Sequence, residues 1–268
     1  MYKYFLIVFV FATQFAHAQE LFVFTEPASN MAAKSIGLRL NNYLMKEQST
    51  NKTNYHVLPE IMWGISKNIM VHVEGFLSNR NSGLVFEGAG IYAKYRFYSV
   101  DEVHSHFRVA AFGRYSFNNS DVHQQAIDLF GHNSGYEGGL VATQLIKKVA
   151  FSATISALHA TDNGKEKFIY GNKKRNAVNY TLSIGKLMLP KVYTSYNQTN
   201  INLMVEILGQ SNAKSGNSFL DVAPSVQFIF LSRMRLDAAY RIPVVTNLSR
   251  TAPKGFFLRL EYNLFNAY

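Results

Sequence analysis

One triplet of the chain places a base and a nucleophile two residues apart. His132, Asn133 and Ser134 form a His-x-Ser sequence, and in extended backbone the first and third side chains point to the same side. A histidine that accepts the serine proton creates the nucleophile of an ester hydrolase. The same residue types also make an ordinary polar turn. Hydrolysis at Ser134 is therefore a lesser alternative, and we expect no catalytic residue.

A second polar group flanks a turn in the first third of the chain. If the chain reverses there, Glu60 lies opposite Glu74 and Met62 lies opposite His72. Like charges directly opposite each other are destabilising, so a cation is required. Arg39, from the preceding strand, is the expected partner. A transition metal held by carboxylate, imidazole and thioether groups is the alternative, but the spacing matches no established motif. We expect no metal and no other cofactor.

The elements that position these residues begin after an export signal. The N-terminus combines Lys3 with an apolar run over 4–12, and Ala16 and Ala18 supply the small residues of a cleavage site. The apolar run is about ten residues long, whereas a spanning helix needs about twenty. We therefore expect a signal peptide cleaved after Ala18 and not an anchor helix. No later stretch reaches spanning length, so a mature chain that enters a membrane must do so as a closed barrel.

Alternation of apolar and polar residues supports that barrel. Near the C-terminus, Phe256, Leu258 and Leu260 fall on one face of a strand, whereas Arg259 and Glu261 fall on the other. Similar runs predict about twelve strands, an even number as in bacterial single-chain barrels. Their expected ranges are 35–46, 54–65, 69–78, 84–99, 106–118, 135–146, 149–160, 177–189, 198–210, 218–231, 234–245 and 255–267.

The connections alternate in length. Tight links at 66–68, 147–148 and 232–233 contrast with long polar loops at 119–134 and 161–176. Short periplasmic turns and long outer loops are typical of outer-membrane barrels. The sequence thus predicts an all-β, single antiparallel up-and-down transmembrane β-barrel. Its expected parts are a signal peptide over 1–18, a periplasmic N-terminal segment over 19–34 and the barrel over 35–268.

Composition agrees with this fold and excludes several others. The 268 residues include 14% aromatics and no cysteine, which excludes disulfides, thiolate metal sites and a cysteine nucleophile. The formal net charge is +10, but the basic residues are scattered, with one short run at 173–175. We therefore expect no nucleic-acid partner. The basic loop 165–175 is either simply solvated or in contact with lipopolysaccharide phosphates.

The charged face of the strands should line the lumen, because a charge facing lipid costs about 2–4 kcal/mol at the midplane. If the charges pair across strands, the tube is closed and serves as a membrane anchor or interaction protein. If arginines stay unpaired, they line a water-filled path. We expect a porin-like passive channel for small solutes with a mild anion preference. The predicted pore-lining residues are Arg39, Glu60, His72, Glu74, Lys94, Arg96, Arg108, Arg114, Glu206, Asp221, Arg235, Asp237, Arg241, Arg259 and Glu261.

Several short segments resemble the porin- and transporter-like outer-membrane proteins of Bacteroidota-type bacteria. They are the stretch 24–29, the proline-containing hairpins at 58–63 and 223–228, the stretch 240–244 and the terminal Tyr268. The resemblance implies the outer membrane of a Gram-negative-type cell, surrounded by lipid and lipopolysaccharide. Tyr268, in phase with the last strand, resembles the signal read by the barrel-assembly machinery.

The His132–Ser134 triplet in turn resembles the motif of outer-membrane phospholipase A and lipid A deacylases. Those families place Asn after the serine, whereas Gly135 follows here.

Overall fold

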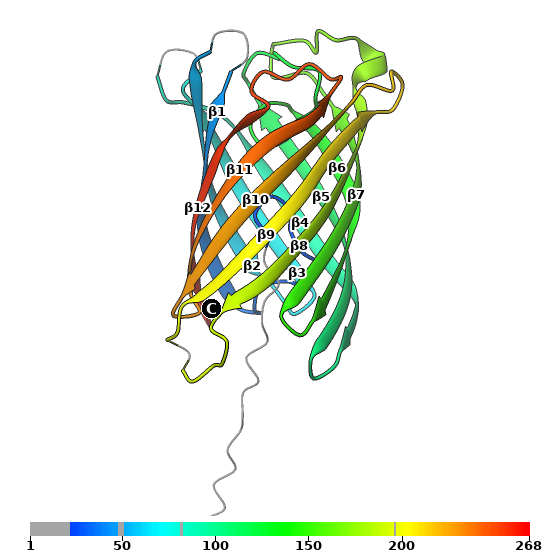
Figure 1. Cartoon of the computed structure of the whole chain (residues 1–268). Coiled ribbons are helices and arrows are strands. Elements are labelled where there is room, and N and C mark those ends of the chain that lie inside the picture. The colour runs from blue at the N-terminus through cyan, green and yellow to red at the C-terminus, as the bar shows by residue number, and fades with distance from the viewer. Residues whose placement is uncertain (1–21, 48–50, 81–82, 196) are drawn as a thin grey trace, which may run out of the picture.

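Twelve antiparallel strands close into one barrel in the computed structural model, which describes residues 22–47, 51–80, 83–195 and 197–268 (Figure 1). Each strand pairs with its neighbours in sequence, and β1 pairs with β12 to close the wall. The predicted all-β up-and-down barrel is confirmed. The strands are β1 (Ser35–Lys46), β2 (Thr53–Gly64), β3 (Ile69–Ser78), β4 (Val85–Asp101), β5 (Ser105–Asn118), β6 (Gly135–Ile146), β7 (Val149–Ala160), β8 (Asn176–Leu189), β9 (Asn200–Asn212), β10 (Ser218–Phe230), β11 (Met234–Thr246) and β12 (Lys254–Leu264), with a short 3-10 helix, η1 (Asn172–Lys174).

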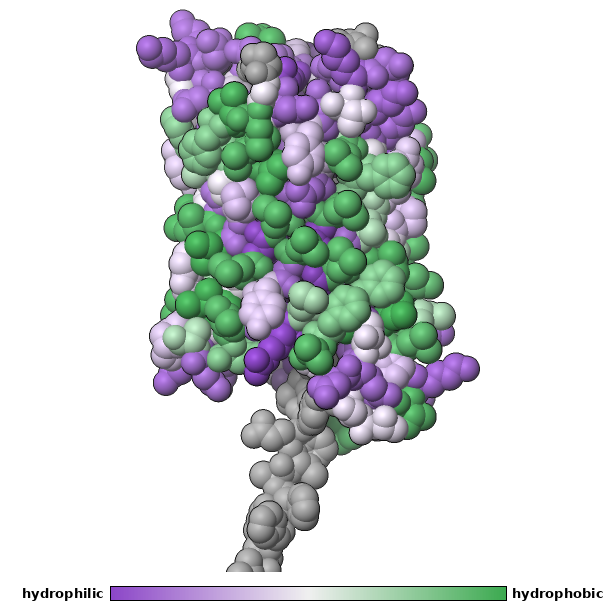
Figure 2. All heavy atoms as spheres, turned by 90° about the vertical axis from the view of Figure 1, so that its left-hand side faces the viewer, coloured by the Kyte–Doolittle hydropathy of each residue, from purple (hydrophilic) through white to green (hydrophobic). Residues whose placement is uncertain are grey.

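The strand faces follow the predicted alternation. On β12, Leu258 and Leu260 are 42% and 50% exposed, whereas the side chains between and beside them, Arg259 and Glu261, are buried. Figure 2 shows hydrophobic residues gathered over the middle height of the barrel and hydrophilic ones at both ends. An apolar outside around a charged inside is the arrangement of a barrel that spans a bilayer. Among the described residues, no helix has the length and hydropathy to cross a membrane.

The two ends of the barrel differ in their connections. We call the end that carries 65–68, 102–104, 147–148, 190–199 and 231–233 the turn end, and the opposite end the loop end. The long connections 119–134 and 161–175 lie at the loop end, as expected. The connection 190–199 does not follow the predicted pattern of short turns at one end and long loops at the other. It lies at the turn end and is longer than the loop-end connection 213–217.

The last strand is shorter than predicted. β12 ends at Leu264, and Asn266 has a φ of 51° that takes the backbone out of the extended conformation. Tyr268 therefore lies outside the strand, and the phase predicted for it was wrong. Its hydroxyl donates to the Gly64 carbonyl at 3.0 Å. A role of Tyr268 as an assembly signal stays a prediction.

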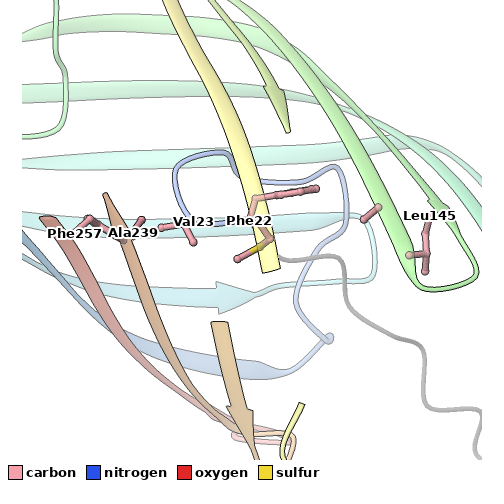
Figure 3. Close-up of a cluster of buried hydrophobic side chains, with 7 residues drawn as sticks. Phe22, Val23, Leu145, Ala239 and Phe257 are labelled. Atoms are coloured by element: carbon pink, nitrogen blue, oxygen red, sulfur yellow. The ribbon is translucent and has the colours of Figure 1, made fainter. Parts of the chain in front are cut away.

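Residues 22–31 lie inside the barrel, whereas Ala32, Ala33 and Lys34 are exposed. β1 begins at the turn end, and the stretch of chain that precedes it extends back into the lumen (Figure 1). Phe22, Val23 and Ala28 of this stretch are buried, and Figure 3 labels the first two. The sequence predicts a periplasmic segment over 19–34; residues 22–31 of it occupy the lumen because charged wall residues bind their backbone. The predicted signal peptide, 1–18, lies outside the described residues.

Candidate functional site: the barrel lumen

The structure places the predicted pore-lining residues on the inner wall. Thirteen of the fifteen are buried, and the other two, Arg96 and Arg241, are half-buried. Because the opposite face of the same strands carries exposed apolar side chains, burial here means that the charged groups face the lumen. The N-terminal segment occupies part of the lumen, so these charges meet one another and that segment.

Arg39 is the centre of the largest ion-pair network. Its guanidinium lies 3.2 Å from a Glu60 oxygen, 2.8 Å from Glu261 and 2.6 Å from Glu26. The predicted pairing of Glu60 opposite Glu74 is confirmed, as is Arg39 as the partner of Glu60. One arginine thus compensates three carboxylates from two strands and the N-terminal segment.

Glu74 has a different partner from the one expected. The Arg114 guanidinium, from β5, donates to the Glu74 carboxylate, and His72 Nδ1 lies 2.5 Å from the other carboxylate, Glu60. Arg39 and Arg114 thus offset the like charges of Glu60 and Glu74. Among the described residues, no three or more His, Asp or Glu side chains are arranged so that they could hold a metal ion.

Further ion pairs lie on the adjoining strands β10, β11 and β12. Arg241 and Arg250 each lie 2.5 Å from the same oxygen of Asp221. Arg235 lies 3.0 Å from Asp237 and 3.4 Å from Glu261. Arg250 was missed from the sequence, because it lies in a loop where no alternation marks an inward side.

Charged wall residues bind the backbone of the N-terminal segment directly. Glu206 accepts hydrogen bonds from the N–H groups of Val23, Phe24 and Thr25 at 2.8, 3.0 and 2.9 Å. Arg259 donates to the Phe22 and Val23 carbonyls at 3.3 and 2.6 Å. Hydrogen bonds to charged groups contribute about 1.5–3 kcal/mol each, so this end of the segment is firmly held.

The rest of the segment is held in the same way. Lys94 donates to the Pro27 and Ser29 carbonyls at 2.5 and 2.8 Å. Thr143 accepts from the Ala28 N–H at 2.9 Å. We call residues 22–31 the plug, because they lie within the lumen and wall side chains hold their backbone.

The loop 119–134 enters the lumen from the loop end. The Gln210 side chain accepts from the Ile127 N–H and donates to its carbonyl, both at 2.8 Å. Ser116 donates to the Leu129 carbonyl at 2.7 Å, and the Arg114 guanidinium lies 3.9 Å from the centre of the Phe130 ring. This loop narrows the loop end of the lumen.

Cavities border the plug toward both ends of the described part of the barrel. The turn-end cavity is about 1000 Å³ and touches the plug at Ser29–Met31. The loop-end cavity is about 180 Å³ and touches the plug at Phe24. The plug therefore borders both spaces, which lie toward opposite ends of the barrel.

The His132–Ser134 pair does not form a hydrolase site. The buried Ser134 hydroxyl donates to the Asn118 carbonyl at 3.1 Å and accepts from the Asn118 N–H at 2.8 Å. Its single proton is committed to the backbone, whereas a nucleophilic serine donates to its base. The His132 ring instead packs against His56, with ring centres 4.6 Å apart.

We predict that Ser134→Ala lowers stability and removes no hydrolase activity. Losing both hydrogen bonds of a buried hydroxyl costs about 1–3 kcal/mol, which denaturant titration of the refolded protein measures. Acyl-ester cleavage by the wild type and the variant should both equal the protein-free background. Cleavage by the wild type that the variant loses would restore the hydrolase hypothesis.

The loop 119–134 should loosen in acid. Burial, reinforced by the positive charge of Arg80, lowers the pKa of His132 from its usual 6.5 to about 3. A histidine with a lowered folded pKa is neutral when the loop is docked and takes up a proton when it is released, so docking weakens as pH falls from about 6.5 toward 3. The protection factors of the loop amides, which correct hydrogen exchange for its intrinsic pH dependence, should fall over this range in the wild type and much less in His132→Gln. An equal fall in both would contradict this role of His132.

The fold is shared with a solved outer-membrane channel. An outer membrane channel from Pseudomonas putida is 12% identical, with a TM-score of 0.55, and the match covers 89% of this chain and 98% of that one. The chain is also similar to the KdgM porin, at 12% identity, a TM-score of 0.49 and coverage of 85% and 98%. The NanC porin is 8% identical, with a TM-score of 0.48 and coverage of 84% and 97%. The likeness to the first shows the fold. No family model matches the sequence, and no curated protein does.

Proposed function

We propose that this protein is a porin-like outer-membrane channel for small solutes, closed in the present conformation by its plug. One observation supports the proposal most strongly: the plug borders two cavities, one toward each end of a polar lumen. The plug is bound by side-chain hydrogen bonds and lacks strand pairing. Its release would join the two spaces without breaking the barrel wall.

A mild anion preference follows from the turn-end cavity. Its lining carries one acidic residue, Asp101, which is paired with Arg108 at 2.8 Å. Basic side chains are in excess, and cavities lined by one sign of charge concentrate ions of the other sign. The basic residues of this lining are Lys67, Arg96, Arg108, Lys147, Lys148, Lys186, Arg233 and Arg235.

Planar-bilayer recording of the refolded mature chain tests both statements. We expect discrete openings whose reversal potential under a salt gradient has the sign of anion selectivity. Lys147→Glu combined with Lys186→Glu should shift the reversal potential toward the cation value, whereas the same change at Lys165 and Lys167 of the loop end should shift it less. A cation-selective wild type would contradict the anion preference alone.

A closed barrel that serves as a membrane anchor or interaction protein is the second candidate function. The occupied lumen and its paired charges favour it. A wild-type protein and a plug-deleted variant that both remain silent in bilayers would favour this candidate over the channel.

The location and partners belong to the same proposal. The apolar outer belt supports contact with outer-membrane lipid, and the exposed loop-end residues Lys165 and Lys167 support contact with lipopolysaccharide phosphates. We also propose export through a signal peptide ending at Ala18 and recognition of the C-terminal strand by the barrel-assembly machinery. The resemblance to Bacteroidota-type porins supports the same assignment.

A further inference from the structure

We infer that the turn-end cavity is a binding site for amphipathic organic anions, that is, a carboxylate attached to a ring or short apolar chain. The inference rests on the proposed function, because it names the solute class of that channel. It is carried by two features that border the same cavity, a set of cations and an apolar floor.

The cations lie at the rim of the cavity. Lys67, Lys147 and Arg233 come from three different turns, and Lys186 comes from β8. In the described ranges these four side chains form no ion pair with a carboxylate, whereas Asp101 already pairs with Arg108. Their charge is therefore available to an incoming anion.

The apolar floor lies deeper. Leu145, Ala150 and Met204 are buried, pack with the plug residue Phe22 and still border the cavity (Figure 3). Gly185 leaves the space for this floor, because a Cβ there would lie 2.9 Å from Met204 Cγ and 3.4 Å from Phe22 Cε1. The floor thus already packs with the aromatic ring of Phe22. The part of the floor that Phe22 does not cover faces the cavity.

The combination selects the ligand class. A hydrophilic anion gains from the rim cations only, and a neutral apolar molecule gains from the floor only. An anion with an apolar body gains from both, since burial of its hydrocarbon adds to the charge attraction. A volume of about 1000 Å³ is at the upper end of small-molecule sites, so a ring-sized ligand fits.

Equilibrium binding to the full mature chain in lipid nanodiscs tests the inference. Three probes of similar size separate the contributions: benzoate, gluconate and benzyl alcohol, each corrected for uptake by empty nanodiscs. We expect benzoate to bind at least about tenfold more tightly than either of the others, since burying one ring face adds this much. Equal binding of benzoate and gluconate would overturn the inference.

Matched variants locate the site. Gly185→Leu should fill the floor and reduce benzoate binding to the gluconate level, and Lys147→Gln with Lys186→Gln should weaken both anions. The same charge loss at Lys165 and Lys167, outside the cavity, should change neither. If Gly185→Leu fails the heat-modifiable gel test for folding, Leu145→Ser replaces it. Unchanged benzoate binding in a folded floor variant would also overturn the inference.

The binding assay needs no current, so its outcome is independent of the channel. If the protein binds benzoate as expected but conducts no ions, the proposed channel function is wrong and the proposed binding site stands. If it conducts ions but shows no preference for benzoate, the proposed binding site is wrong and the channel function stands.

Discussion

Deleting residues 22–29 should convert a mostly closed protein into one that stays open. The deletion removes the stretch between the two cavities while β1 and its pairing with β12 remain intact. Single-channel recording should show steady open steps in the variant, against rare or brief openings in the wild type. The variant should still show the gel shift of a folded barrel on heating.

A milder change should act in the same direction. Glu206→Ala removes the acceptor of three plug N–H groups, which weakens plug docking by at least what one such bond contributes, about 1.5–3 kcal/mol. The open probability should rise by at least about tenfold, at 1.4 kcal/mol per factor of ten. Glu87→Ala is the matched control, because Glu87 is an inward carboxylate that bonds Ser78 and not the plug. Silence after the plug deletion would mean that the loop 119–134 or the wall side chains also close the lumen.

Arg39→Ala should cause the largest loss of stability. The variant leaves Glu26, Glu60 and Glu261 without the cation that pairs with all three. Breaking a buried ion pair by removing one partner costs about 3–5 kcal/mol, because the remaining charge stays desolvated. Urea titration of the refolded barrel, followed by the fluorescence of Trp63, the single tryptophan of the chain, measures this difference.

Two further variants test whether unpaired buried charge causes the loss of stability in Arg39→Ala. Arg233→Ala removes an exposed arginine whose contact is the Phe265 ring at 6.0 Å, and it should change stability by less than about 0.5 kcal/mol. Adding Glu60→Gln and Glu261→Gln to Arg39→Ala should recover part of the loss, because fewer unpaired charges stay buried. An Arg39 variant no less stable than the Arg233 variant would mean that water or other cations compensate the three carboxylates.

The strands could be predicted closely because their signal is local. Lipid on one side and charge on the other impose a period of two on every strand, and β1, β3, β6 and β7 have the predicted bounds. The fifteen inward charges could be chosen for the same reason. The end of β12 was overestimated, since apolar residues continue past Leu264 after the backbone leaves the extended conformation at Asn266.

The contacts inside the lumen could be predicted only where neighbouring strands make them. Arg39 and Glu60 face each other across β1 and β2, so the register of this hairpin was sufficient to predict their contact. Arg114 reaches Glu74 past the intervening strand β4, which register between neighbours does not reveal. The plug has no periodic pattern at all, and its bond to Glu206 joins residues 183 positions apart.

The point at which the plug joins the wall bears on the order of assembly. Ser35 begins β1 opposite Gly64, at the turn end, so the preceding residues can enter the cylinder from their own side after β1 and β12 have paired. No terminus has to be threaded across the bilayer. The wall can therefore form first around an aqueous interior, with the N-terminal stretch docking as the final step of maturation.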